Sequence, residues 1–200
     1  IMSIGFFAQM DQAVVWRGPM ATKALTQLIH DPHWGELDFL LIDLPPGTGD
    51  IHLSMVQNVP VTGAVIVSTP QKVALTDARK GVAMFKMDQI SVPVLGLIEN
   101  MSYFSPPELP ENKYYLFGKE GAQNLAKQLD IPFLGELPLV QSIREAGDVG
   151  RPAALQEGTV IPLAFEEITR NIVAEVAKRN ENLPPTEIVR ITTMAGCATK

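Results

Sequence analysis

One short segment constrains the fold of this chain more than any other. Residues 38–50 have the sequence DFLLIDLPPGTGD, an apolar run that ends at Asp43 and is followed by a Pro-Pro-Gly-Thr-Gly turn. Apolar runs of this length, bounded by turn residues, are typical of buried strands in a parallel sheet. In open α/β sheets, ligands bind beyond the carboxyl ends of the strands, which is where Asp43 falls. We therefore predict a strand over residues 39–43 with a ligand site at its end.

The chemistry of this segment points to a nucleotide. A carboxylate at a strand end, here Asp43, can hold a water bound to Mg²⁺, and a glycine such as Gly47 can bring its backbone N–H close to a phosphate. The segment is similar to the Walker B and switch II region of a nucleotide hydrolase, with Asp43, Gly47 and Asp50 as candidate catalytic residues. The alternative is a plain strand-to-turn connection in which Asp50 is the N-cap of the next helix.

The phosphate-binding half of such a site is absent from these 200 residues. Neither a Gly-x-x-x-x-Gly-Lys-[Ser/Thr] nor a Gly-x-Gly-x-x-Gly motif occurs in the sequence. Residue 1 is Ile, and it already lies in an apolar run over residues 1–7 that is typical of an interior strand. We therefore expect this chain to be the C-terminal part of a longer protein, with a sheet that is incomplete at its N-terminus.

Strand-like and helix-like segments alternate along the rest of the chain. Three further strands are expected, at residues 63–68, 92–99 and 131–136. Apolar residues at spacings of three and four predict helices at residues 19–30, 71–87, 119–129 and 162–178. This alternation predicts the α/β class, with a doubly wound, mostly parallel sheet of the P-loop NTPase type.

Two segments interrupt the alternation. Residues 100–117 are polar and contain three prolines, and long loops after strands are often functional. The sequence Asn-Glu-Asn-Leu-Pro-Pro, which begins at Asn180, resembles a linker. We therefore predict one domain over residues 1–179, followed by a linker and C-terminal tail over residues 180–200. Residues 187–194 could form a short strand or a tail that packs on a partner.

Two other strand ends carry candidate ligand residues. Asn100 follows the strand expected at 92–99, and an amide there can read a base through its donor and acceptor groups, although a lone Asn is more often a turn residue. Pro138 and Leu139 follow the strand expected at 131–136. Their backbone could form a wall of a purine pocket or could be purely structural.

Composition excludes several classes of protein. Hydrophobic residues make up 46% and charged residues 19%, which is typical of a globular protein rather than a disordered one. The net charge of −6, without a basic stripe, argues against a nucleic-acid partner. No run of 18 apolar residues occurs, so we expect no membrane partner. The single cysteine, Cys197, excludes an intramolecular disulfide and fits the reducing environment of the cytoplasm.

Six sequence pieces together resemble the Mrp/ApbC-type iron–sulfur cluster carriers, a branch of the deviant-Walker ATPases that also include MinD and ParA. The pieces occur in the order of that family and cover about residues 1–178. They are MSIGF from Met2, WRGPM from Trp16, LIDLPPGTGD from Leu41, IENMSYF from Ile98, FG from Phe117 and IREAGDVGRP from Ile143.

The resemblance implies a homodimer that binds and hydrolyses ATP with Mg²⁺, carries a [4Fe–4S] cluster and passes it to apo iron–sulfur proteins, in contact with cluster scaffolds. It implies that Asp43 belongs to the Mg²⁺ shell through a water. It further implies that the Gly47 N–H contacts the γ-phosphate and that Asn100 reads the adenine. The phosphate loop of the family precedes the MSIGF strand, in agreement with its absence here.

One departure from the family concerns the cluster itself. The family commonly follows Met-Ser-Tyr-Phe with a Cys-x-x-Cys pair, and two such pairs across the dimer hold the cluster through thiolates. This chain has Ser105-Pro-Pro-Glu108 instead. Cys197 is one conceivable cluster ligand from each subunit, but further ligands would be required. Two alternatives to a cluster carrier therefore stay open: a MinD/ParA-like, nucleotide-switched ATPase without a cluster, and an inactive interaction fragment.

The missing phosphate loop leads to a first prediction. A carboxylate and a glycine cannot by themselves hold a triphosphate, so the isolated 200-residue chain is expected to release no phosphate from ATP above the buffer background in the presence of Mg²⁺. A phosphate-release assay checks this. Turnover that is abolished by Asp43→Ala would contradict the prediction, because it would show a complete catalytic site in these residues.

Overall fold

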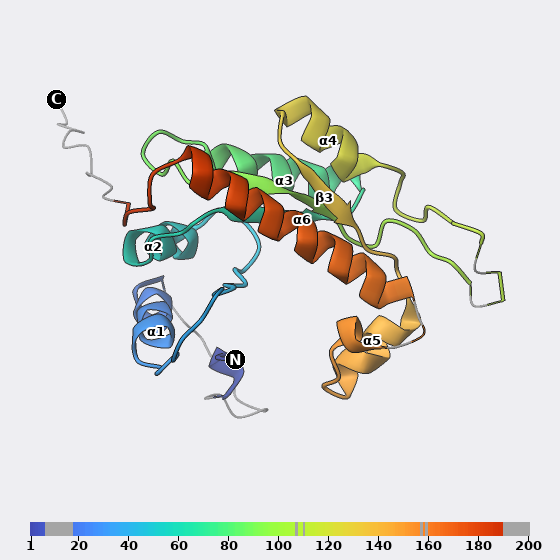
Figure 1. Ribbon diagram of the computed structural model, residues 1–200, viewed down its shortest axis with the longest axis horizontal. Coiled ribbons are helices and arrows are strands. Elements are labelled where there is room, and N and C mark those ends of the chain that lie inside the picture. The colour runs from blue at the N-terminus through green and yellow to red at the C-terminus, as the bar shows by residue number, and fades with distance from the viewer. Residues whose placement is uncertain (7–17, 107, 110, 157, 159, 190–200) are drawn as a thin grey trace. The chain divides into compact units, whose positions relative to one another are not determined.

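The structure is a computed structural model of the chain, and it describes residues 1–6, 18–106, 108–109, 111–156, 158 and 160–189 (Figure 1). The chain divides into two compact units. The first unit consists of Ile1–Val61, Asp88–Ile90 and Thr186–Lys200. The second consists of Thr62–Met87 and Ser91–Pro185.

The second unit is built on a parallel sheet of three strands. The strands are β1 (Ala64–Ser68), β2 (Val94–Glu99) and β3 (Phe133–Glu136), and they lie in the order β1-β2-β3. Both neighbouring pairs are parallel, with Val67 opposite Ile98 in the first and Glu99 opposite Glu136 in the second. A parallel neighbour requires a crossover connection, which a helix supplies in each case.

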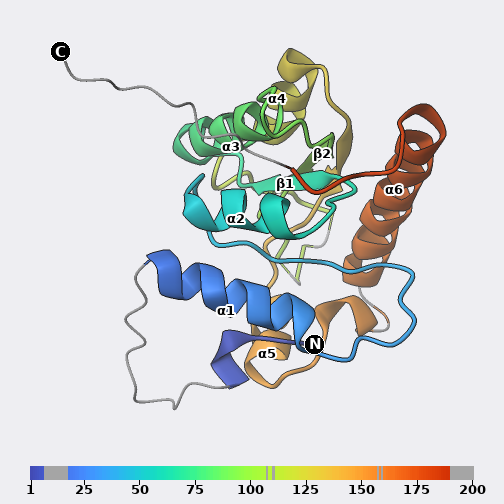
Figure 2. The same cartoon turned by 90° about the vertical axis from the view of Figure 1, so that its left-hand side faces the viewer.

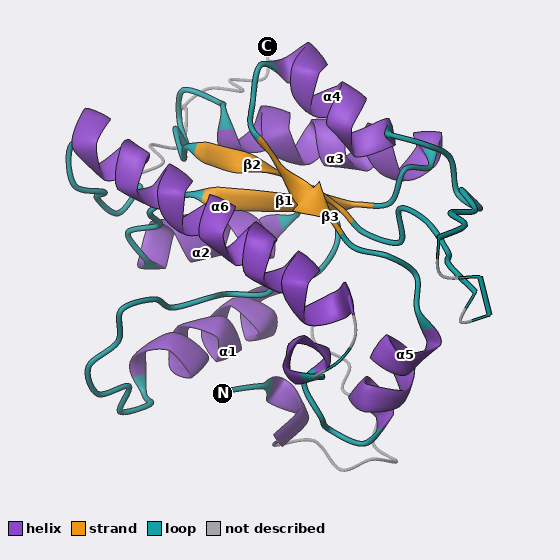
Figure 3. Cartoon of the chain, turned by 45° about the vertical axis from the view of Figure 1, so that its right-hand side comes forward, coloured by secondary structure: helices purple, strands orange, loops and turns teal. Residues whose placement is uncertain are grey.

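Helices cover both faces of this sheet (Figure 3). The crossover helices α3 (Lys72–Phe85) and α4 (Gly121–Leu129) lie side by side on one face, and α6 (Val160–Asn182) lies on the other. Between β3 and α6 the chain forms a shorter helix, α5 (Gln141–Asp148), and a turn of 3-10 helix, η2 (Ala153–Leu155). Two helical layers around a parallel sheet confirm the predicted doubly wound α/β class.

The core follows from the alternation of side chains along β2. Leu97 is fully buried on the face of α3 and α4, whereas the next residue, Ile98, faces α6, because successive residues of a strand point to opposite faces. On the first face Leu97 packs against small and branched residues at helical spacing: Ala78, Val82, Ala122, Leu125 and Ala126. On the second face Ile98 packs with Leu134 and Ile168.

The first unit contains two helices that pack on each other, α1 (Gly18–His30) and α2 (Asp50–Asn58) (Figure 2). The hydroxyl oxygens of Thr22 and Ser54 lie 3.1 Å apart and join the two helices. The Trp34 indole N–H donates to the carbonyl oxygen of Ile29 over 2.7 Å and ties the following turn to the end of α1. The unit begins with one turn of 3-10 helix, η1 (Ile4–Phe6).

Most of the predicted elements are confirmed. The strands predicted at 63–68, 92–99 and 131–136 are β1, β2 and β3, each slightly shorter than expected. The helices predicted at 19–30, 71–87, 119–129 and 162–178 are α1, α3, α4 and α6. The helices α2 and α5 are additional to those predicted. The buried face of α2 includes the polar His52 and Ser54, and α5 buries only Ala146, so neither shows the apolar stripe that revealed the equally short α4.

Two strand predictions are wrong for the described residues. Over residues 39–43 the chain has no regular structure, and Leu41 is largely exposed. In the predicted strand at 1–7, residues 1–3 are irregular, η1 occupies residues 4–6, and residue 7 lies outside the described part. The physical reason is the same at both places. A strand needs neighbouring strands to satisfy its backbone N–H and C=O groups, and among the described residues neither run has such a partner.

The tail prediction is tested only in part. No strand forms over residues 187–189, but the backbone N–H of Val189 donates to the Val56 carbonyl oxygen over 3.0 Å, so this segment lies against α2 within the first unit. Residues 190–200, which include Cys197, lie outside the described residues. The helix α6 continues past the expected boundary at residue 179 to Asn182. The division of the chain into 1–179 and 180–200 stays a prediction.

None of the described helices combines the length and the apolar character that crossing a membrane would require.

A buried carboxylate joins the central strand to α4. Glu99, the last residue of β2, is 1% exposed, and its Oε2 accepts the backbone N–H of Ala122 over 2.6 Å. The residue that precedes the helix, Glu120, has a left-handed backbone (φ +56°) and makes no capping hydrogen bond with its own side chain. The N-terminus of a helix favours a hydrogen-bond acceptor and a negative charge. For α4, the Glu99 carboxylate of the sheet supplies both.

The pKa of Glu99 reflects this position. Burial raises the pKa of Glu99 above its ordinary value of 4.5, the hydrogen bond from Ala122 opposes this rise, and the nearby carboxylates of Glu136 and Glu120 add to it. Between pH 4.5 and the raised native pKa, the native state thus binds more protons than the unfolded state. The free energy of unfolding must therefore fall as the pH rises through this window.

This leads to a second prediction. Glu99→Gln keeps an oxygen that can accept the Ala122 N–H but cannot titrate, so the fall in stability between pH 4.5 and the native pKa of Glu99 is expected to disappear in this variant. Glu99→Ala leaves a buried N–H unpaired and is expected to cost about 1–3 kcal/mol at neutral pH. Urea unfolding over a pH series measures both effects.

Glu181→Gln is the matched control, because Glu181 is an exposed carboxylate of α6. Its pH dependence should match that of the unmodified chain. A Glu99→Gln variant with an unchanged pH dependence would show that Glu99 does not titrate as its burial requires.

Candidate functional site

The carboxyl edge of the sheet gathers the candidate base-binding residues of the second unit. Asn100 directly follows β2, and its backbone N–H donates to the carbonyl oxygen of Ser68, at the end of β1, over 2.8 Å. Its Oδ1 accepts the backbone N–H of Met101 over 2.9 Å, and Met101 adopts a left-handed conformation (φ +54°). Asn100 is therefore a turn residue in this structure. Its side-chain amino group has no hydrogen-bond partner among the described residues.

The segment after β3 lies directly beside the segment after β2. The Leu137 N–H donates to the Glu99 carbonyl oxygen over 2.8 Å, and the Leu139 N–H donates to the Tyr103 carbonyl oxygen over 2.7 Å. Pro138 between them is buried, and Leu139 is half-buried. The structure thus brings Pro138 and Leu139 to the same sheet edge as Asn100, as expected for the ends of neighbouring parallel strands.

Ser102 holds these two segments together from inside. It is completely buried, and both its backbone N–H (3.0 Å) and its hydroxyl (3.2 Å) donate to the carbonyl oxygen of Leu137. Its burial excludes Ser102 from direct contact with a ligand. Its contacts fix the spacing between the Asn100 turn and the Pro138 segment.

The loop over residues 100–117 is closed by a short pairing. Phe104 and Tyr114 exchange two backbone hydrogen bonds of 2.8 Å each, so the described residues between them lie at the tip of the loop. Of the residues that stand in place of the cysteine pair, Ser105 is half-buried and Glu108 is exposed at this tip. The pairing gives the loop a defined base beside the Asn100 turn.

A lysine cross-links this loop to the sheet. The Lys113 Nζ lies 3.8 Å from the centre of the Tyr103 ring and 3.3 Å from Oε1 of Glu136, the last residue of β3. Burial lowers the pKa of Lys113, but Tyr103 and Glu136 together outweigh burial, so that the pKa is raised above its ordinary value. Lys113 is therefore a cation at neutral pH and is held in place by these contacts.

The candidate catalytic residues belong to the first unit. Asp43 is exposed, and its carboxylate makes no hydrogen bond or ion pair with any described residue. Gly47 has a left-handed backbone (φ +100°), and a side chain there would meet no atom within 4 Å, so the backbone alone favours glycine. Chemically, this segment offers a free carboxylate and an accessible backbone N–H on one exposed loop.

The N-cap alternative for Asp50 is wrong. Gly49 occupies the N-cap of α2, and Asp50 is the first residue of the helix and makes no capping hydrogen bond with its side chain. The Asp50 carboxylate is exposed at the positive end of a helix dipole. Asp43, Gly47 and Asp50 thus lie on one continuous segment that leads into α2.

The described residues contain no preformed metal cluster site. No group of three or more His, Cys, Asp or Glu side chains is arranged to hold a metal ion within them. The other predicted metal ligand, Cys197, lies outside the described residues.

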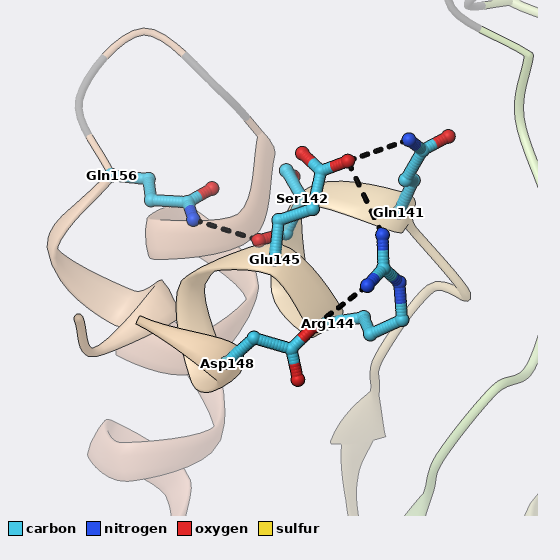
Figure 4. Close-up of polar contacts among 6 residues, drawn as sticks. All are labelled: Gln141, Ser142, Arg144, Glu145, Asp148 and Gln156. Carbon is cyan, nitrogen blue, oxygen red and sulfur yellow. Dashed lines mark hydrogen bonds and ion pairs between the residues drawn. The ribbon is translucent and has the colours of Figure 1, made fainter. Parts of the chain in front are cut away.

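The IREAGDVGRP motif forms most of α5 and carries a network of ion pairs (Figure 4). Arg144 contacts Asp148 at 2.6 Å and Glu145 at 3.3 Å, and the Gln141 side chain donates to the same Glu145 oxygen over 2.6 Å. The Gln156 amide donates to the Ser142 carbonyl oxygen over 3.0 Å and attaches the following turn. All of the charged groups are more than half exposed, so these pairs orient Arg144 and add little stability.

Sequence reasoning did not identify Glu99 and Lys113 as parts of this site. Glu99 carried a usable signal, since a carboxylate at the end of a run as apolar as VLGLI must be paired when it is buried. The sequence gives no comparable signal for Lys113, because its two partners, Tyr103 and Glu136, are 10 and 23 residues away in the sequence.

Comparison with known proteins agrees with this architecture. The profile of the ParA family described as "NUBPL iron-transfer P-loop NTPase" matches residues 1–176. An iron–sulfur cluster carrier protein of Synechocystis is 46% identical over 178 residues, which cover 88% of this chain and 50% of that protein. The mouse iron–sulfur cluster transfer protein NUBPL is 46% identical over 92% of this chain and 56% of its own length. The chain spans about half the length of these relatives.

Solved structures give the same fold. A nucleotide-binding protein of Archaeoglobus fulgidus, determined in complex with ADP, is 41% identical, with a TM-score of 0.58 over 65% of this chain and 52% of that one. MinD of Pyrococcus horikoshii, complexed with Mg-ADP, is 24% identical, with a TM-score of 0.57 over 80% of this chain and 60% of its own, and shows the fold alone. From the profile match and the two relatives, this chain belongs to the NUBPL iron-transfer P-loop NTPase family.

Proposed function

We propose that this chain is part of an ATP-hydrolysing carrier that delivers [4Fe–4S] clusters to apo-proteins. The observation that carries the proposal is the family match over residues 1–176, together with relatives near 46% identity that are named as iron–sulfur cluster carrier or transfer proteins. The exposed Asp43–Asp50 segment and the Asn100 edge of the sheet are consistent with it, because each offers polar groups that have no partner among the described residues.

In this proposal the first unit acts on the phosphates. The Asp43 carboxylate is exposed and unpaired among the described residues, and it therefore fits a water-bound Mg²⁺, which prefers oxygen ligands. Bound Mg²⁺ would neutralise phosphate charge during hydrolysis. The Gly47 N–H would donate to the γ-phosphate, and Asp50 would supply a second carboxylate at the start of α2.

The second unit would bind the base. The Asn100 amino group has no partner among the described residues and would donate to a ring nitrogen of adenine, while the Asn100 Oδ1 stays on the Met101 N–H. Pro138 and Leu139 would form the adjacent wall of the pocket with their backbone, at a spacing set by the contacts of Ser102. A fixed amide beside a preformed wall favours one base over others.

The cluster would be the cargo of the protein, and this role implies which partners the protein has. Two copies of the protein would form a homodimer, receive the cluster from a scaffold and pass it to apo iron–sulfur proteins. A reducing compartment, the cytoplasm, suits such cargo. The residues 105–108 supply no thiolate, so they do not fit the usual cluster ligation, and no transfer step is derived through them.

The second candidate is a nucleotide-switched ATPase of the MinD type that carries no cluster. The replacement of the cysteine pair by Ser105-Pro-Pro-Glu108 favours it, because hydroxyl and carboxylate groups are poor substitutes for thiolates at such clusters. In this case ATP-driven dimerisation would act on a partner protein directly.

The third prediction tests the nucleotide site in the full-length protein. Asp43→Asn is expected to lower kcat for Mg-ATP hydrolysis about 100-fold or more, because it removes the charge that holds the metal-bound water. Asn100→Ala is expected to reduce the preference for ATP over GTP about tenfold with a smaller effect on kcat. Steady-state phosphate release with both nucleotides measures these changes.

Asp38→Asn serves as the matched control, since Asp38 is an exposed carboxylate five residues before Asp43. It should keep the original kcat. Asp43→Asn with unchanged turnover would refute the assigned role.

Anaerobic reconstitution with iron and sulfide separates the two candidates. Iron and sulfide bound in a stoichiometric ratio, together with transfer to an apo-protein, support the carrier. ATP hydrolysis without any bound iron favours the switch. The absence of both hydrolysis and bound iron contradicts both candidates.

A further inference from the structure

A groove between α3 and α4 is unusual in its charge. It is an open cavity of about 540 Å³ within the second unit, and Asn100, Pro138 and Leu139 are not among the residues that line it. Its floor is apolar, formed by Leu75, Leu125 and Phe117. Three cations line it: Lys72, Arg79 and Lys119. We call this the α3–α4 groove, and we define it by these six residues.

No carboxylate is among the residues that line this cavity, although the chain as a whole carries a net charge of −6. Lys72 makes no ion pair with any described residue. The Arg79 guanidinium donates over 2.7 Å to the side-chain oxygen of Gln128, a neutral group that leaves the charge uncompensated. Lys119 lies 3.5 Å from Glu120, in an exposed pair that is weak in water. Three cations are thus available to an anionic ligand.

The walls of the groove are held by backbone packing. A Cβ on Gly121 would lie 2.5 Å from the Pro70 carbonyl oxygen, and one on Gly118, whose φ is +111°, would lie 3.3 Å from it. The two glycines therefore let the segment before α4 approach the turn before α3 closely. The opposite faces of both helices are anchored in the core by Val82 and Ala122, so the groove exists before any ligand binds.

We propose that the α3–α4 groove binds an acidic, extended peptide segment of a partner protein. Charge complementarity selects the partner, because cations that have no carboxylate partner, or only a weak and exposed one, attract carboxylates. The apolar floor would accept an aliphatic side chain between those carboxylates. The groove lies wholly within the second unit and involves neither the nucleotide-binding candidates nor a cluster, so this proposal does not depend on the proposed function.

The spacing of the cations favours a peptide over a small anion. Lys72 and Arg79 are seven residues apart on α3, which corresponds to about 10 Å along the helix axis. A ligand that contacts both side chains without bending them toward each other must span a similar distance, which exceeds the size of one phosphate. A peptide in the extended polyproline II conformation has three residues per turn and advances about 3.1 Å per residue, so carboxylates three residues apart lie on one face and match this separation. The apolar floor and the negative net charge argue in the same way against a nucleic acid.

Fluorescence anisotropy with the 200-residue chain tests the proposal. The probe is a fluorescein-labelled peptide of about ten residues built of Glu-Leu-Ser repeats, which places carboxylates three residues apart with Leu between them. Binding is expected to weaken at least tenfold in the double variant Lys72→Glu/Lys119→Glu. The control, Lys80→Glu/Lys127→Glu, makes the same charge change on α3 and α4 outside the groove, and it should weaken binding less than twofold.

An experiment with reversed charges on both the chain and the peptide distinguishes a lost binding site from an unfolded variant. The Lys72→Glu/Lys119→Glu variant should bind a labelled peptide in which Lys replaces every Glu, whereas the unmodified chain should not. This gain cannot result from unfolding. Lys72→Ala/Lys119→Ala removes the charges without adding new ones and is expected to weaken binding of the acidic probe by a smaller factor.

Four outcomes would overturn the proposal. The first is an equal loss of binding in the groove and control variants, which would show non-specific attraction. The second is the absence of binding of the acidic probe to the unmodified chain. The third is displacement of the probe by inorganic phosphate at matched charge concentration, which would indicate a small-anion site. The fourth is tighter binding of a single-stranded oligonucleotide of equal length and charge, which would indicate a nucleic acid.

Discussion

The hydrogen bond between the Glu99 carboxylate and the Ala122 backbone N–H is the contact on which the second unit depends most. It joins the central strand to the start of α4 across 23 residues, including the whole loop over 100–117. A buried charge is costly unless it is paired, and this one is paired with a helix N-terminus that lacks a local cap. The core around Leu97 and the sheet edge at Asn100 lie on either side of this contact.

The same contact helps to position the groups at the carboxyl edge. Because Glu99 ends β2 at a fixed place, Asn100 turns beside Ser68, and the backbone of Leu137 pairs with the carbonyl oxygen of Glu99. Ser102 adds a second connection between the segments after β2 and β3, because its hydroxyl donates to the carbonyl oxygen of Leu137. The polar groups that could contact a base are thus held in place by the central strand, although they lie on loops. The α3–α4 groove uses the opposite arrangement, with exposed cations on α3 and on the segment before α4.

The sequence predicted the three observed strands well because each is a short apolar run bounded by turn residues, and each finds parallel neighbours in the described chain. It predicted α1, α3, α4 and α6 because their apolar residues recur at spacings of three and four residues. It failed at residues 39–43, where the run is just as apolar but has no strand beside it among the described residues. It also failed to reveal the attachment of Lys113 to Tyr103 and Glu136, which depends on how the loop folds back.

By itself, the sequence determined the α/β class, the helix and strand periods of the second unit and the family, because local patterning and motif order are properties of the chain alone. The tertiary structure decided which of those patterns became strands, since backbone pairing requires a partner that no local pattern supplies. It also decided that Asn100 lies at the same sheet edge as Pro138 and Leu139, and that three cations from α3 and the segment before α4 line one groove. Such neighbours arise only from the packing of segments that are distant in the chain.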